Sequence, residues 1–188
     1  MQAFLISTGI VALAEMGDKT QLLALLLAAR FKRPWPIVLG ILVATVINHA
    51  MAGALGAWVT SQITPQTLRY ILGGSFIVMA AWMLVPDKLD DNAGQKVLPR
   101  SALGVFGTTA VLFFLAEMGD KTQIATVMLA ARFDAYLAVV AGTTLGMMLA
   151  NAPVVWLGER MTRLVPLRVV RFASAGVFLG LGLWALLG

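Results

Sequence analysis

The nine residues LAEMGDKTQ, from Leu13 to Gln21, occur again unchanged from Leu115 to Gln123. Both copies lie inside strongly apolar sequence, although each copy carries two acidic residues and a lysine. Ionisable groups within apolar segments are energetically costly and usually functional. The fold and the function of this chain must both account for the repeated motif.

The composition of the chain is that of an integral membrane protein. Its mean hydropathy is +0.87, 60% of its 188 residues are hydrophobic and only 12% are charged, whereas soluble domains carry about 25% charged residues. The net charge of +5 therefore reports membrane topology and does not indicate nucleic-acid binding. Because the chain contains no cysteine, disulfides and thiolate metal sites are excluded.

Six apolar segments are long enough to cross a bilayer as helices, which takes about 20 residues each. Proline, polar and charged residues separate them. The chain is therefore predicted to be an all-α membrane protein with six transmembrane helices. The expected spans are 2–29, 36–59, 67–86, 102–131, 136–158 and 168–187.

The motif is the most visible part of an internal duplication. When the chain is shifted by 102 residues, Gly40 aligns with Gly142, Phe76 with Phe178, and Trp82 with Trp184. We predict a first three-helix repeat at 1–86, a cytoplasmic linker at 87–101 and a second repeat at 102–188. Three spans per repeat make the second repeat inverted relative to the first. Inverted repeats are typical of secondary transporters, whose sites lie near the bilayer midplane.

The distribution of basic residues predicts the orientation. If both termini lie outside, ten of the 14 Lys and Arg residues fall on the cytoplasmic side and two, Arg69 and Arg132, on the outer side. Lys19 and Lys121 then remain within the membrane. The positive-inside rule favours this orientation, which in a bacterial inner membrane places both termini in the periplasm.

On a continuous helix, Glu15, Asp18 and Gln21 would share one face, and Lys19 could reach either acid. The second motif repeats this arrangement. Inverted symmetry would bring the two motifs face to face. The candidate cation ligands are the acids and amides of both copies: Glu15, Asp18, Gln21, Glu117, Asp120 and Gln123.

Four carboxylates and two lysines leave a site with a charge of about −2, which one divalent cation or two protons would neutralise. Metal and protons would then compete for one cluster, as a cation/proton antiporter requires. Oxygen ligands suit Ca²⁺, Mg²⁺ or Mn²⁺. His49, which aligns with Asn151 in the second repeat, is either a nitrogen ligand that favours Mn²⁺ or a hydrogen-bonding group between helices.

Two other readings stay open at this point. Asp18 and Asp120 could form the aspartate pair of an intramembrane protease, although each aspartate has its own glutamate and lysine beside it. Alternatively, the motifs could form internal ion pairs in a structural membrane subunit.

The doubled pattern E-x-G-D-[KR]-[TS] resembles the cation/proton exchanger family that includes the Golgi and chloroplast manganese/calcium transporters. Short bacterial members of this family resemble manganese exporters of the MneA type. The resemblance covers essentially the whole chain. It implies export of Mn²⁺, with Ca²⁺ as the alternative ion, in exchange for protons. It also implies a bacterial inner-membrane transporter rather than an enzyme.

The resemblance further implies which residues act. Glu15, Asp18, Glu117 and Asp120 would form the core of the cation site. The rest of the motif consists of Lys19, Thr20, Lys121 and Thr122.

Overall fold

The structure is a computed structural model that describes residues 1–85, 101–158 and 167–187. In these residues the chain forms eight helices and no strands. All but the last residue of the predicted linker 87–101 lies outside the described ranges. So do five of the predicted cytoplasmic basic residues, which are Lys88, Lys96, Arg100, Arg160 and Arg163.

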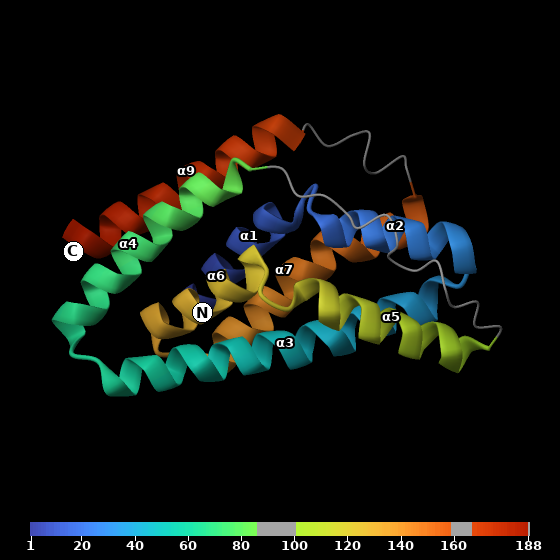
Figure 1. Ribbon diagram of the computed structural model, residues 1–188, viewed down its shortest axis with the longest axis horizontal. Helices are drawn as coiled ribbons and strands as arrows, with labels where there is room; N and C mark the ends of the chain where they lie inside the picture. Colours follow the sequence, from blue (N-terminus) through green and yellow to red (C-terminus); the bar gives the residue numbers. More distant parts are fainter. Residues whose placement is uncertain (86–100, 159–166, 188) are drawn as a thin grey trace.

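Each of the six expected segments is helical, and the first and fourth are each divided into two helices (Figure 1). The helices are α1 (Gln2–Glu15), α2 (Lys19–Phe31), α3 (Pro34–Gln62), α4 (Pro65–Met83), α5 (Ala102–Glu117), α6 (Lys121–Phe133), α7 (Tyr136–Leu157) and α9 (Leu167–Leu187).

Local sequence signals explain several helix ends. Pro34 and Pro65 stand in the first turns of α3 and α4, where proline costs no backbone hydrogen bond. The Ser101 hydroxyl accepts a hydrogen bond from the Gly104 N–H at 3.0 Å and caps α5. Lys32 and Asp134, which align in the duplication, end α2 and α6 in the left-handed conformation.

By length and composition, three helices of the described residues can cross a membrane: Pro34–Gln62, Tyr136–Leu157 and Arg168–Leu187. The pair α5 and α6, bent by 71°, adds a fourth if it counts as one span. This establishes an all-helical protein with three or four candidate spans. The six-span inverted repeat stays a prediction.

The helices pack in pairs that the duplication relates. α1 lies against α7 and α5 lies against α3, while α4 and α9 lie side by side along one edge (Figure 1). Phe76 on α4 and its duplicate Phe178 on α9 contact each other with ring centroids 6.1 Å apart. The broken helix of each repeat therefore packs on the second span of the other repeat.

Close glycine contacts show how faithfully this packing repeats. A methyl group at Gly142 would lie 3.1 Å from Cβ of Ser7, and one at Gly40 would lie 2.8 Å from Cβ of Thr109. The two contacts correspond at a shift of 102 residues, because Gly40 aligns with Gly142 and Ser7 aligns with Thr109. Small residues permit such close helix approach in membranes, so the α1–α7 and α3–α5 interfaces are duplicated in space as well as in sequence.

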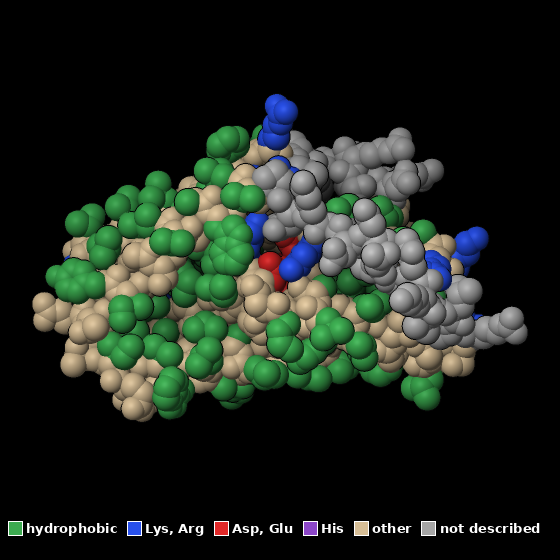
Figure 2. Space-filling view, viewed as in Figure 1, with side chains coloured by type: hydrophobic (Ala, Val, Ile, Leu, Met, Phe, Trp, Pro, Cys, Tyr) green, Lys and Arg blue, Asp and Glu red, His purple; other side chains and the backbone are tan. Residues whose placement is uncertain are grey.

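Two hydrophobic clusters flank the motifs. One joins α4 and α9 to α6 around Phe76, Phe178 and Leu129, and the other joins α2, α3 and α5 around Leu27, Ile41 and Phe113. Many large apolar side chains also point outward, as the hydrophobic atoms spread over the visible face show (Figure 2). An apolar exterior of this kind suits contact with lipid.

Candidate cation site

The two motifs break their helices in the same way. Glu15 ends α1, Met16 is extended, Gly17 has φ +83° and Asp18 precedes α2. In the second copy Glu117 ends α5, Gly119 has φ +75° and Asp120 precedes α6. The expectation that Glu15, Asp18 and Gln21 share one face of a continuous helix is therefore wrong, because a glycine with positive φ interrupts the helix between the acids.

The motif glutamines stabilise the backbone at these breaks by hydrogen bonds. Oε1 of Gln21 accepts a hydrogen bond from the Gly17 N–H at 2.9 Å, and Oε1 of Gln123 accepts one from the Gly119 N–H at 2.7 Å. Nε2 of Gln21 also donates to the Ala150 carbonyl on α7 at 3.1 Å. The two glutamine oxygens, expected as cation ligands, are thus engaged by the backbone of their own motif.

Each break also places two helix ends beside the acids. The ends of α1 and α5 direct carbonyl oxygens toward their breaks, and such ends favour cations. The starts of α2 and α6 favour the carboxylates of Asp18 and Asp120. Oδ1 of Asp120 accepts a hydrogen bond from the Lys121 N–H at 2.7 Å. Broken helices with ends of both kinds are the usual ion and substrate sites of secondary transporters.

The break in the second motif offers a direct test of its geometry. Replacing Gly119 by alanine meets no neighbouring atom within 4 Å but keeps the positive φ, so we expect a loss of about 1–2 kcal/mol in unfolding free energy. Gly107→Ala on α5 is the matched control, because Gly107 also has free space around it but is helical without a positive φ. The control should be neutral or stabilising by about 0.5–1 kcal/mol. Thermal unfolding in detergent measures both, and equal stability of the two variants would contradict the assigned strain.

Glu15 joins the two halves of the protein. Its Oε2 accepts hydrogen bonds from Thr20 Oγ1 at 2.7 Å and from Asn151 Nδ2 at 3.4 Å, and its Oε1 accepts one from the Thr122 hydroxyl. Thr122 and Asn151 belong to the second repeat. Since the Glu15 side chain is fully buried, these donors replace the water that a carboxylate needs.

Glu117, the duplicate of Glu15, has a different environment. It is fully buried, and neither carboxylate oxygen has a hydrogen-bond partner. It lies within electrostatic range of Glu15, Asp120 and Lys19. A buried carboxylate without donors requires an explanation, and a bound cation is a natural one.

Both motif lysines contact chain segments outside their own motif. Nζ of Lys19 lies 3.2 Å from Oδ2 of Asp120, in the other repeat, whereas the sequence placed it within reach of the acids of its own motif. Nζ of Lys121 donates to the Val85 carbonyl at 2.9 Å beyond the end of α4 and lies 5.9 Å from the Trp82 ring centre. Lys19 therefore links the first motif to the second.

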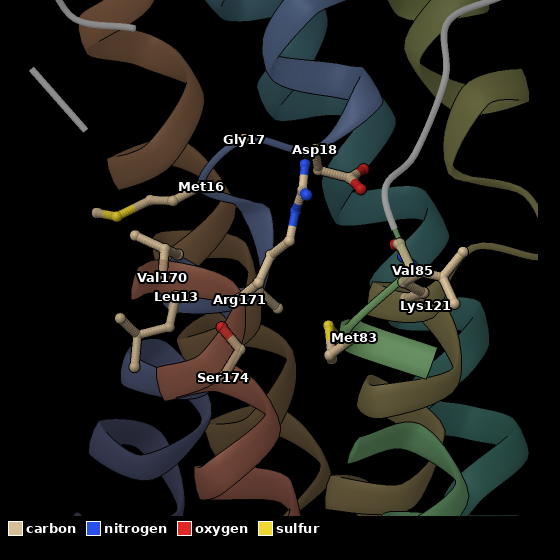
Figure 3. Close-up of a pocket in the computed structure, with 11 residues that line it drawn as sticks. Leu13, Met16, Gly17, Asp18, Met83, Val85, Lys121, Val170, Arg171 and Ser174 are labelled. Atoms are coloured by element: carbon tan, nitrogen blue, oxygen red, sulfur yellow. The ribbon is translucent and has the colours of Figure 1, made fainter. Parts of the chain in front are cut away.

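A small cavity of about 20 Å³, enough for about one water molecule, reaches the first motif at Gly17 and Asp18. α9 contributes Arg171 and Ser174 to its lining, and Arg171 points toward the Asp18 carboxylate (Figure 3). Red acidic atoms are visible in a hollow of the molecular face, with basic side chains beside them (Figure 2).

Sequence reasoning did not name Arg171 as a site residue, because it counted Arg171 only among the basic residues of the cytoplasmic side. Its duplicate Arg69 bonds elsewhere, donating to the Ala185 carbonyl at 3.0 Å and to the Leu186 carbonyl. The alignment of the two arginines at a shift of 102 residues was the available signal.

The structure thus joins Glu15, Thr20, Thr122 and Asn151 directly, and pairs Lys19 with Asp120. His49 is fully buried, and neither ring nitrogen has a hydrogen-bond partner. Within the residues that the structure describes, no three histidine, aspartate or glutamate side chains converge closely enough to hold one metal ion.

An apolar helical protein with buried acids at two broken helices has the architecture of a secondary transporter rather than an enzyme. The comparisons with known proteins agree. The family described as "Divalent cation/proton antiporter GDT1" matches residues 3–91 and 105–188. The chain belongs to this GDT1 family, whose members are transporters, and the intramembrane protease reading has no support.

Named relatives cover nearly the whole chain. The chain is 49% identical over 180 residues to a Vibrio cholerae protein named "Putative manganese exporter", covering 95% of this chain and 88% of that protein. It is 22% identical to "Divalent cation/proton antiporter GDT1" of Saccharomyces cerevisiae, covering 95% of this chain and 81% of that protein. A rice "GDT1-like protein 4" is 28% identical, over 96% of this chain and 72% of the relative. No solved structure matches the chain.

Proposed function

We propose that this protein exports Mn²⁺ from the cytosol in exchange for protons across a bacterial inner membrane. The observation that carries the proposal is the buried cluster around Glu15, where donors from both repeats meet one carboxylate. Glu117 lies within electrostatic range of it without a hydrogen-bond partner of its own. The name of the Vibrio cholerae relative supports manganese as the ion, and Ca²⁺ is the alternative.

The cation site in this proposal consists of Glu15, Asp18, Glu117 and Asp120. Two like charges about 4 Å apart repel by about 4 kcal/mol at an effective dielectric of about 20. In the absence of metal the cluster therefore binds protons as a coupled group, and an arriving divalent cation displaces them. Because one set of carboxylates binds either species, export of one ion is coupled to import of the other.

Alternating access in this proposal uses six spans arranged as two inverted repeats, with both termini in the periplasm. The reciprocal packing of α1 on α7 and of α5 on α3 supports a twofold arrangement of the repeats. In this proposal the site opens alternately to the two sides of the membrane as one repeat moves against the other.

The test is metal uptake into proteoliposomes or inverted vesicles with an acidic interior, comparing Mn²⁺ with Ca²⁺ and Mg²⁺. We expect Mn²⁺ uptake that stops when the pH gradient is collapsed. Preferential uptake of Ca²⁺ would mean that Ca²⁺, not Mn²⁺, is exchanged for protons at the same site. No uptake of any of these ions by folded protein would refute the exchanger.

A further inference from the structure

Among the described residues, two fully buried side chains that carry two polar atoms each have no hydrogen-bond partner on either atom. They are His49 on α3, with both ring nitrogens, and Glu117 on α5, with both carboxylate oxygens. Buried polar groups are almost always paired, so an unpaired group indicates a missing water, ion or ligand. An imidazole nitrogen and a carboxylate oxygen are both donors that a transition-metal ion accepts.

The duplication relates these two residues to a pair in contact. His49 and Glu117 correspond to Asn151 and Glu15 at a shift of 102 residues. Nδ2 of Asn151 lies 3.4 Å from Oε2 of Glu15.

The helix packing around the two pairs is equally duplicated. The close contact of Gly142 with Ser7 between α7 and α1 recurs as that of Gly40 with Thr109 between α3 and α5. Nδ2 of Asn48, the neighbour of His49, donates at 3.1 Å to the Phe114 carbonyl, one turn before Glu117. The region of α3 around His49 therefore lies against the end of α5 that carries Glu117.

We propose that His49 and Glu117 supply one nitrogen and one carboxylate ligand to the transported ion, and that His49 gives the site its preference for Mn²⁺ over Ca²⁺ and Mg²⁺. This inference rests on the proposed cation exchange and adds its selectivity element. Ca²⁺ and Mg²⁺ take oxygen ligands, so a nitrogen ligand favours a transition metal over both. Because no third acidic or histidine side chain of the described residues converges with such a pair in this conformation, water completes the coordination there.

The duplication also explains why one half carries histidine and the other asparagine. Asn151 uses its amide N–H to bond Glu15, Met147 Sδ and the Met147 carbonyl, which makes it a positioning group for a carboxylate. A histidine at the equivalent place keeps a lone pair for a metal. Only one repeat then supplies nitrogen, which leaves the rest of the site to oxygen ligands.

Pulsed electron paramagnetic resonance of Mn²⁺ bound to the purified full-length protein tests this proposal, since it detects nitrogen nuclei coordinated to the metal. We expect a nitrogen coupling in the wild type and its loss in His49→Asn, which copies the residue of the other repeat. The preference of the binding site for Mn²⁺ over Ca²⁺ should fall about 10-fold or more in this variant. Tyr136→Phe, which removes a hydroxyl that donates to the Ala50 carbonyl beside His49, is the control and should keep the nitrogen coupling.

Mn²⁺ bound to the wild type without nitrogen coupling would overturn the proposal, and that result needs no variant to fold. An unchanged Mn²⁺ preference in both His49→Asn and His49→Gln would overturn it as well. Both outcomes leave the exchanger intact, because Mn²⁺ still binds. Failure of the exchanger has a different signature, which is the absence of Mn²⁺ binding and of transport in the wild type.

Discussion

Replacing Glu117 by glutamine is expected to reduce Mn²⁺ uptake at least about 100-fold while the protein stays folded. Glu117 is fully buried and accepts no hydrogen bond, so its replacement by glutamine breaks no hydrogen bond of the folded protein. A carboxylate about 4 Å from a cation contributes several kcal/mol at an effective dielectric of about 20. A loss of about 3 kcal/mol already weakens ion binding about 100-fold. Proton-driven uptake into proteoliposomes measures the effect.

Glu15→Gln is the matched comparison, because it removes the duplicate carboxylate from a different environment. The Glu15 oxygens accept hydrogen bonds from Thr20, Thr122 and Asn151. A glutamine offers one oxygen and places its own N–H groups against these donors. We therefore expect the same loss of transport together with a loss of about 1–3 kcal/mol in unfolding free energy.

The two variants separate function from structure. Thermal unfolding in detergent should show Glu117→Gln at or above the wild-type stability and Glu15→Gln below it. Wild-type uptake by Glu117→Gln would remove this residue from the site. Equal destabilisation of both variants would instead mean that Glu117 has structural partners like those of Glu15.

Much of this architecture could be predicted from the sequence, because its signals are periodic or repeated. The six apolar segments are all helical, because their composition acts locally, as do Pro34 and Pro65 at the starts of α3 and α4. The duplication at 102 residues predicted that the motifs belong to equivalent places. The contacts of Gly40 and Gly142 repeat that relation in space.

The geometry within the motif could not be predicted in this way. Spacing alone placed Glu15 and Asp18 on one helical face, because a continuous helix was assumed. The actual backbone depends on the Gly17 N–H, which bonds the Gln21 side chain instead of continuing the helix. This is a competition between two hydrogen bonds, and residue spacing does not reveal its outcome.

The partners of the charged side chains could not be predicted from residue spacing either. Spacing within the helix favoured Lys19 with Glu15 or Asp18, whereas Lys19 pairs with Asp120 in the other repeat. Such a pairing depends on how the two repeats approach each other. For the same reason Arg171, which lines the cavity at Asp18, was not expected beside the motif.

Replacing Lys19 by methionine is expected to destabilise the protein by about 2–4 kcal/mol at neutral pH and to impair transport. Asp120 is 4% exposed, and Lys19 Nζ is its ion-pair partner at 3.2 Å. Removing one partner of a buried pair costs about 3–5 kcal/mol. The expected loss is smaller because the Lys19 side chain is 26% exposed and solvent screens part of the interaction.

Two controls make this prediction specific. Lys19→Arg keeps the positive charge and should retain most of the stability. Lys32→Met removes a charge from an exposed position at the end of α2 and should change it by less than about 0.5 kcal/mol. A Lys19→Met protein as stable as Lys32→Met at neutral pH would mean that the ion pair of Lys19 with Asp120 does not stabilise the folded protein.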